Sequence, residues 1–223
     1  SGELPVLDLP TDQPRPPVQT YAGATQRVIL GEKDSQMIKQ IAIDNNVTEY
    51  AVLLGLFSWF IHIITQQDDF VVGLPTANRE NLATKDLLGI FLNNLPIRLH
   101  IDTGQNFRVL LQVISERLIN ILDQKEYPFE KMIRTNDIKS VSLEGLGMKG
   151  QFLPSPNTKF DLNVRVLDKG ANFIFLFEYN TNLFNQETIS NFIDIYIGLV
   201  KKAFSAIDLP LRDINYFDFF KNS

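Results

Sequence analysis

The 223-residue chain contains no cysteine. Disulfide bonds, thiolate metal sites and cysteine nucleophiles are therefore excluded from it. Only two histidines are present, His62 and His100, and they are far apart in the sequence. Because histidine is the side chain most often used as a general base near neutral pH, the chain has few residues for catalysis.

The chain also lacks a long apolar run and an excess of basic residues. Its most apolar stretch, residues 51–64, is interrupted by Gly55, Ser58 and His62 and is short for a membrane span. Asp and Glu outnumber Lys and Arg by 26 to 21, and the net charge of −5 argues against a nucleic-acid surface. No basic and then apolar signal opens the sequence. We therefore expect a cytoplasmic, soluble domain with no nucleic-acid and no membrane partner.

Chemical motifs are sparse as well. Gly145-Leu146-Gly147 lacks the strand-to-helix context and the Lys-Ser/Thr of a phosphate-binding loop. No carboxylates stand at a metal-ligand spacing from the two histidines, which we interpret as solvated or structurally hydrogen-bonded. Asp68-Asp69 is typical of a turn rather than of a catalytic pair. The residues alone predict no catalytic group, no directly bound cofactor and no metal site.

The first half of the chain begins with a proline-rich linker. Residues 4–20 hold five prolines, which favours an extended segment lying on a surface, and we place the linker region at residues 1–25. A domain over residues 26–223 follows. It should start with a strand at residues 26–30 and a helix capped by Asp34 or Ser35. Thr48 is the expected N-cap of a second helix, which runs to about Gln66 and is apolar on nearly all sides.

The remaining segments alternate between strands and helices. A strand over residues 70–75 should end at Pro75, and residues 95–101 should form a strand with alternate residues buried. Helical spacing predicts a helix over residues 107–123 and another from near Asn185. Between them, a hairpin is expected around Asp168-Lys169-Gly170. We predict a single α/β sandwich, with helices packed on a mixed β-sheet.

Several ordered stretches resemble the C-terminal lobe of nonribosomal peptide synthetase condensation domains. Residues 73–79 match the family's Gly-x-Pro-x-Ala-x-Arg segment, and residues 88–98 are similar to its Ile-Gly-x-Phe-Val-Asn-Thr-Leu-x-x-Arg motif. The order and spacing fit over roughly residues 4–207. The other matches are the connector at residues 7–16, Tyr-Pro-Phe-Glu at 127–130, and the late hairpin and turn at 159–162 and 178–184.

This resemblance implies half of a chloramphenicol-acetyltransferase-like fold, in which two lobes enclose a tunnel. The N-terminal lobe of the family brings His-His-x-x-x-Asp-Gly, and no such motif occurs in this chain. The implied partners are an N-terminal lobe, peptidyl carrier proteins and an adjacent adenylation domain. Substrates would arrive as thioesters on the phosphopantetheine arms of carrier proteins, with no cofactor bound directly by this chain.

The resemblance also indicates residues that could face the tunnel or cleft. These candidates are Arg79, Asn93, Asn94, Asp161 and Tyr179. Four of them have a structural alternative: Asn93 could satisfy backbone groups, Arg79 could anchor a loop, and Asp161 and Tyr179 could stabilise the hairpin.

The chain departs from the family pattern in three places. Asn94 replaces the usual Thr, and Gln124-Lys125-Glu126 replaces His/Asn-Gln-Asp. The Arg-Asp-x-Ser-x-x-Pro-Leu motif and the strand that follows it in the family are missing. Only 24 residues separate Arg134 from Lys159, where the family usually has a longer stretch.

Two functions follow as hypotheses. The first is a half-domain that forms amide bonds with its N-terminal lobe and is inactive alone. The alternative is a non-catalytic module that binds carrier proteins.

Overall fold

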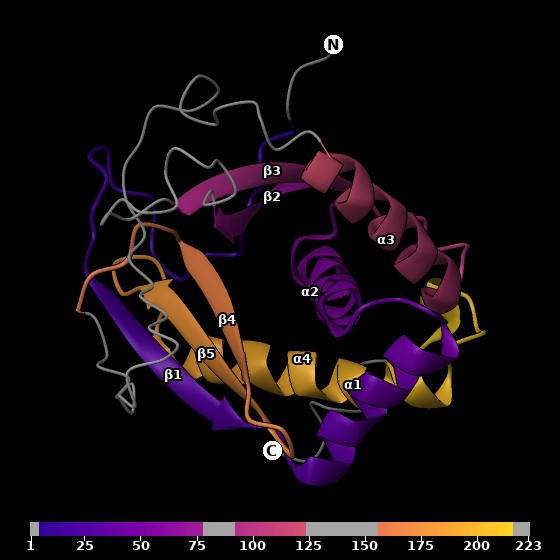
Figure 1. Ribbon diagram of the computed structural model, residues 1–223. Coiled ribbons are helices and arrows are strands. Elements are labelled where there is room, and N and C mark those ends of the chain that lie inside the picture. Colours follow the sequence, from indigo (N-terminus) through magenta and orange to yellow (C-terminus); the bar gives the residue numbers. More distant parts are fainter. Residues whose placement is uncertain (1–4, 78–91, 124–155, 216–223) are drawn as a thin grey trace, which may run out of the picture.

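A computed structural model describes residues 5–77, 92–123 and 156–215, and Figure 1 shows their arrangement. The segments predicted around residues 78–91 and 124–155, including Gly145-Leu146-Gly147 and the Tyr-Pro-Phe-Glu stretch, lie outside the described residues. The elements in chain order are β1 (Gly23–Ile29), α1 (Glu32–Asp44), α2 (Glu49–Thr65), β2 (Asp69–Ala77), β3 (Leu92–His100), α3 (Phe107–Asp123), β4 (Leu162–Asp168), β5 (Phe173–Asn180), α4 (Gln186–Ser205) and a 3-10 turn (Leu211–Asp213).

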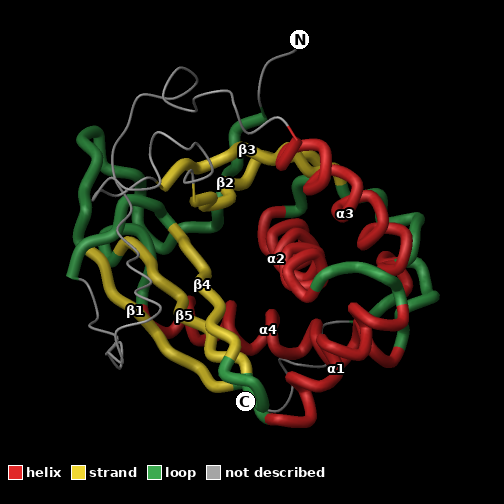
Figure 2. The backbone as a smooth tube through the Cα atoms, viewed as in Figure 1, coloured by secondary structure: helices red, strands yellow, loops and turns green. Residues whose placement is uncertain are grey.

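The described strands form two antiparallel sheets rather than the one mixed sheet predicted above. One sheet has the order β1-β5-β4, and the other pairs β2 with β3 (Figure 2). Antiparallel pairing is the form that a hairpin such as β4–β5 produces, whereas a parallel pair needs a long crossover. The α/β class is confirmed, and the strand directions are the part of the prediction that differs.

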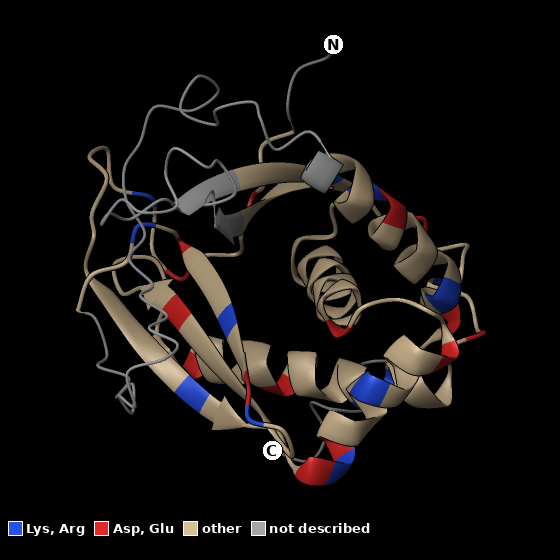
Figure 3. Cartoon of the chain, in the orientation of Figure 1, with Lys and Arg blue, Asp and Glu red and all other residues tan. Residues whose placement is uncertain are grey.

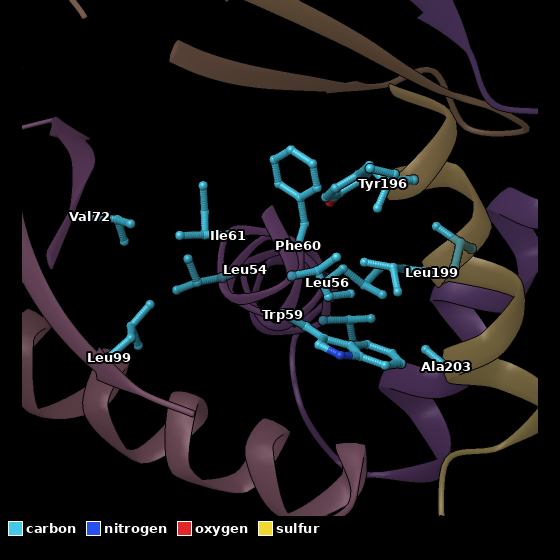
Figure 4. Packing of buried hydrophobic residues seen from close by; sticks show 14 of the residues in the cluster. Leu54, Leu56, Trp59, Phe60, Ile61, Val72, Leu99, Tyr196, Leu199 and Ala203 are labelled. Carbon is cyan, nitrogen blue, oxygen red and sulfur yellow. The ribbon is translucent and has the colours of Figure 1, made fainter. Parts of the chain in front are cut away.

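Helix α2 is the centre of the packing, as its apolar sequence predicts. It contacts α1, α3 and α4, and Glu49 in its first turn is its one charged residue (Figure 3). Viewed along its axis, α2 directs apolar side chains to several sides (Figure 4). Thr48 is its N-cap, with the side-chain oxygen accepting a hydrogen bond from the Ala51 amide at 3.1 Å. The predicted N-cap and helix length are therefore confirmed.

Tyr196 of α4 joins this helix to the three-stranded sheet. Its ring packs edge-on against Phe60 of α2 and against Phe175 and Phe177 of β5, with centroids 5.3–6.0 Å apart. The hydroxyl donates to the Leu53 carbonyl at 3.2 Å. Complete burial raises the pKa of this phenol, because the charged form loses its hydration.

Four local predictions about strands and helices hold. Strand β3 buries alternate residues and exposes Arg98 and His100 between them, α3 spans residues 107–123, and α4 follows its N-cap Asn185. The β4–β5 hairpin turns at residues 169–172, where Gly170 has a φ of 79°.

Four boundaries are wrong. Strand β3 begins at Leu92, three residues before the predicted start at residue 95. Helix α1 begins at Glu32 after the N-cap Gly31, not after Asp34 or Ser35, because Ser35 is buried and hydrogen-bonds Leu30 and Phe173 instead. Strand β1 begins at Gly23, three residues earlier than predicted. Strand β2 continues past Pro75, which is tolerated because a two-stranded sheet has only edge strands.

Candidate functional site

The polar centre of the β4–β5 hairpin is a cluster around Glu178. Its carboxylate accepts a hydrogen bond from the Asn163 amide nitrogen at 2.7 Å and a second from the Arg165 guanidinium. The Glu178 side chain is only 16% exposed and that of Arg165 is 33% exposed. Because both partners are partly withdrawn from water, this ion pair holds its geometry better than a surface pair. The cluster can orient polar groups, but it offers no nucleophile.

Asp161 precedes β4 and is tied to the linker. Its Oδ2 lies 2.8 Å from Nη1 of Arg15, and its backbone carbonyl accepts a hydrogen bond from the Asn180 amide at 3.0 Å. The carboxylate is one-third exposed. Asp161 therefore connects the linker, the start of β4 and the end of β5.

Tyr179 lies on the core side of β5. It is 4% exposed and belongs to the same hydrophobic cluster as Phe175 and Phe177, whereas Glu178 lies on the opposite face of the strand. Sequence alternation alone could have separated Tyr179 from Glu178. The structure therefore brings Glu178, Asn163 and Arg165 together and leaves Tyr179 with the core.

Asn93 and Asn94 belong to the second sheet. They occupy β3 positions opposite Thr76 and Pro75 of β2, and the structure describes their backbone only. Arg79 lies outside the described residues. The next pair along the two strands is Leu74 opposite Leu95, and both of these side chains are buried.

That leucine pair lines an apolar pocket with a volume of about 680 Å³. The pocket lies between the start of α2, the second half of α3 and the β2–β3 pair. Its size is in the range of small-molecule sites. Sequence reasoning missed the pocket because separate segments form it. The lining residues are Asn46, Val47, Thr48, Tyr50, Leu74, Leu95, Ser115, Leu118, Ile119 and Ile121.

The two histidines have the structural environments predicted for them. Nδ1 of His62 lies 3.0 Å from the Asp68 carboxylate and 3.2 Å from the Gln67 carbonyl, at the end of α2. His100 is exposed on β3, opposite Asp69. The Asp69 carboxylate is engaged by Arg98, whose guanidinium hydrogen bonds lower the pKa of that carboxyl. Asp68 and Asp69 thus have separate partners and do not act as a pair.

Within residues 5–77, 92–123 and 156–215, no three His, Asp or Glu side chains converge in a way that could hold a metal ion. Over the same ranges, no single helix is long and apolar enough to cross a membrane. Helices α1 and α2 reach the required length and hydropathy only as a pair that bends by 109°.

The fold matches that of a solved condensation domain, the first one of the calcium-dependent antibiotic synthetase, with a TM-score of 0.73 at 15% identity, over 87% of this chain and 47% of that one. A holo form of AB3403, a four-domain nonribosomal peptide synthetase bound to AMP and glycine, superimposes with a TM-score of 0.83 at 20% identity, over 95% of this chain and 19% of that one. The X-domain from teicoplanin biosynthesis gives a TM-score of 0.77 at 13% identity, over 94% of this chain and 53% of that one. These matches confirm the chloramphenicol-acetyltransferase-like fold class.

The sequence matches point to the same family. Surfactin synthase subunit 1 of Bacillus subtilis (strain 168) is 31% identical over 235 residues, which cover 96% of this chain and 7% of that protein. This chain spans between 4% and 9% of the length of such relatives. The family model described as "Condensation domain" matches residues 1–146. The chain therefore belongs to the condensation-domain family.

Proposed function

We propose that this chain is the C-terminal lobe of a nonribosomal peptide synthetase condensation domain. Together with an N-terminal lobe, it would form amide bonds between aminoacyl or peptidyl thioesters carried by carrier proteins. The observation that carries the proposal is the extent of the structural match, because nearly the whole chain corresponds to about half of the X-domain from teicoplanin biosynthesis. The absence of adjacent histidines from the sequence supports a division in which the other lobe supplies them.

In this proposal, the lobe contributes a wall of the substrate cleft rather than a reacting group. Asn93 and Asn94 are the best-placed candidates, because their backbone pairs adjoin the Leu74–Leu95 pair that lines the apolar pocket. Arg79 stays a candidate from its motif. Asp161 and Tyr179 would support the wall, since one pairs with the linker and the other packs in the core.

The proposal also names the partners. Peptidyl carrier proteins would present both substrates on phosphopantetheine arms, so this lobe would need no cofactor of its own. An adenylation domain would be adjacent in the same cytoplasmic assembly. The AB3403 synthetase, which shares this fold, consists of four domains, and this supports a multidomain setting.

A reconstitution experiment tests the function. The chain is combined with an N-terminal lobe that carries the paired-histidine motif, together with donor and acceptor carrier proteins loaded with aminoacyl thioesters. Mass spectrometry should detect a dipeptidyl thioester on the acceptor only when both lobes are present. A matched N-terminal lobe with both histidines replaced by alanine should give none. Turnover by this chain alone would overturn the half-domain proposal.

The reconstitution, combined with a binding measurement, also tests the second hypothesis, a carrier-protein-binding module. This alternative is favoured by one observation, that His62 contacts the Asp68 carboxylate and the Gln67 carbonyl rather than a hydroxyl nucleophile. NMR titration with the loaded acceptor carrier protein would show binding. Binding without product in the two-lobe mixture would replace the half-domain proposal with the binding module, and no shifts at millimolar concentration would exclude the module.

A further inference from the structure

The linker is hydrogen-bonded to the lobe although residues 5–21 contain no helix or strand. Its first attachment is Gln67, which follows α2. The Gln67 side chain accepts a hydrogen bond from the Asp8 amide at 2.8 Å and donates one to the Val6 carbonyl at 3.0 Å. One carboxamide therefore satisfies a backbone donor and a backbone acceptor, as a neighbouring strand would.

The second attachment is the N-terminus of α4. Asn185 is the N-cap of this helix, but its side chain makes no cap hydrogen bond. Asp12 of the linker instead places a carboxylate at this helix end. Its carboxylate accepts hydrogen bonds from the Asn185 amide and from the Thr188 hydroxyl, both at 2.7 Å. A carboxylate at this end of a helix is stabilised by the free amides and the helix dipole.

Backbone contacts strengthen the second attachment. The amides of Asp12 and Gln13 both donate to the Leu183 carbonyl, at 2.8 and 3.2 Å. Between the two attachments, Leu9 is 8% exposed and belongs to the hydrophobic core. The linker is therefore held by side-chain, backbone and apolar contacts within eight residues, and its prolines lower the entropy that ordering costs.

We propose that residues 6–13 occupy a peptide-binding surface of this lobe, made by Gln67, Leu183, Asn185 and Thr188, and move with it as one body. The surface suits an extended, proline-rich segment that offers backbone donors and one carboxylate. The proposal rests on the proposed function in one respect only. If an N-terminal lobe precedes this chain, residues 6–13 move with the C-terminal lobe and not with the N-terminal one.

Amide hydrogen exchange of the 223-residue chain, followed by NMR, tests the attachment. The amides of Asp8, Asp12, Gln13 and Asn185 should exchange more slowly than free amides. Asp12→Ala should speed exchange at Gln13 and Asn185 by about tenfold or more, because it removes a charge-assisted acceptor. Gln67→Leu should speed exchange at Asp8 and leave Asn185 protected, since the two attachments are separate.

Asp8→Ala is the matched control. It also removes one negative charge from the linker, but the hydrogen bond that Asp8 makes to Gln67 uses only its backbone amide. This variant should leave exchange at Gln13 and Asn185 unchanged. If core amides of α4 lose protection in Asp12→Ala, then Asp12→Asn, which keeps an acceptor oxygen, should restore them. The proposal would be overturned if the linker amides of the unmodified chain were unprotected. It would also be overturned if Asp8→Ala sped exchange at Gln13 and Asn185 as much as Asp12→Ala does.

This shared movement is tested in the protein that contains both lobes. Spin labels on Gln13→Cys and Asn191→Cys are suitable, because both positions are exposed and the chain has no cysteine of its own. Their distance distribution should be single and narrow, with or without carrier proteins. A broad or shifting distribution would show that residues 6–13 do not move with the lobe and would overturn the proposal. None of these measurements depends on turnover, so their failure and that of the condensation activity can be distinguished.

Discussion

Arg15 of the linker and Asp161 before β4 form an ion pair, with Nη1 and Oδ2 2.8 Å apart. The pair joins segments that are far apart in the chain, close to the point where Asn180 donates its amide to the Asp161 carbonyl. It gives Asp161 a structural partner beyond the hydrogen bonds of the hairpin. The linker therefore neutralises a carboxylate that the sequence motif placed among the cleft candidates.

A double-mutant cycle measures this pair. Because the side chains are 55% and 33% exposed, solvent screens the interaction, and we expect a coupling of about 0.2–1 kcal/mol between Arg15→Gln and Asp161→Asn. Urea unfolding of the four proteins gives the value. If Asp161 acts only through Arg15, the two single variants should destabilise equally. A much larger loss for Asp161→Asn would show that Asp161 has a further partner.

A substitution at Gly23 tests the close contact between β1 and the segment before β4. A Cβ at this position would lie 2.8 Å from the backbone nitrogen of Thr158, which cannot move without breaking its hydrogen bond to Tyr21. We expect Gly23→Ala to lower the free energy of unfolding by about 1–3 kcal/mol. Gly73→Ala is the control, because a Cβ there meets nothing within 4 Å. Equal stability of the two variants in urea titrations would contradict the close approach.

Tyr196→Phe isolates one buried hydrogen bond. The substitution removes the donor to the Leu53 carbonyl while keeping the ring that packs against Phe60, Phe175 and Phe177. We expect a loss of about 1 kcal/mol in unfolding free energy, since a buried acceptor is left without its donor. Tyr21→Phe on the exposed linker should change stability little. An unchanged free energy of unfolding in Tyr196→Phe would mean that the hydroxyl does not contribute to the stability of the core.

The elements that local patterns determine were predictable from the sequence. Thr48 caps α2 because its hydroxyl and the amide that it satisfies are three residues apart, so the signal lies within one turn. Strand β3 follows from alternation, because every second residue faces the core. For the same reason the apolar circumference of α2 indicated its central place.

The features that depend on distant contacts were not predictable. Asp12 reaches Asn185 across 173 positions, and no local pattern links a proline-rich segment to that helix end. Ser35 looks like an N-cap in sequence, yet tertiary packing directs its hydroxyl to Leu30 and Phe173. The separation into two sheets depends on which strands pair, and periodicity carries no information about partners.

The ion pair between Asp69 and Arg98 should make the free energy of unfolding depend on pH in the acid range. Hydrogen bonds from Arg98 lower the pKa of Asp69 in the folded chain. Stabilisation by the pair should therefore be complete above the ordinary carboxyl pKa of about 4 and be lost as the pH falls through the folded value. Because Asp69 and Arg98 lie at the surface, the effect on the melting temperature should be small and should shrink in high salt.

Arg98→Gln tests this dependence. The Asp69 titration midpoint, followed by carboxyl NMR, should rise toward the ordinary value in the variant. The melting temperature of the variant should lie below that of the unmodified chain at pH 7, and the gap should close on acidification. Arg27→Gln removes a positive charge from an exposed position of β1 and should leave the Asp69 midpoint in place. A gap that persists below the folded pKa would mean that Arg98 stabilises the chain through contacts other than Asp69.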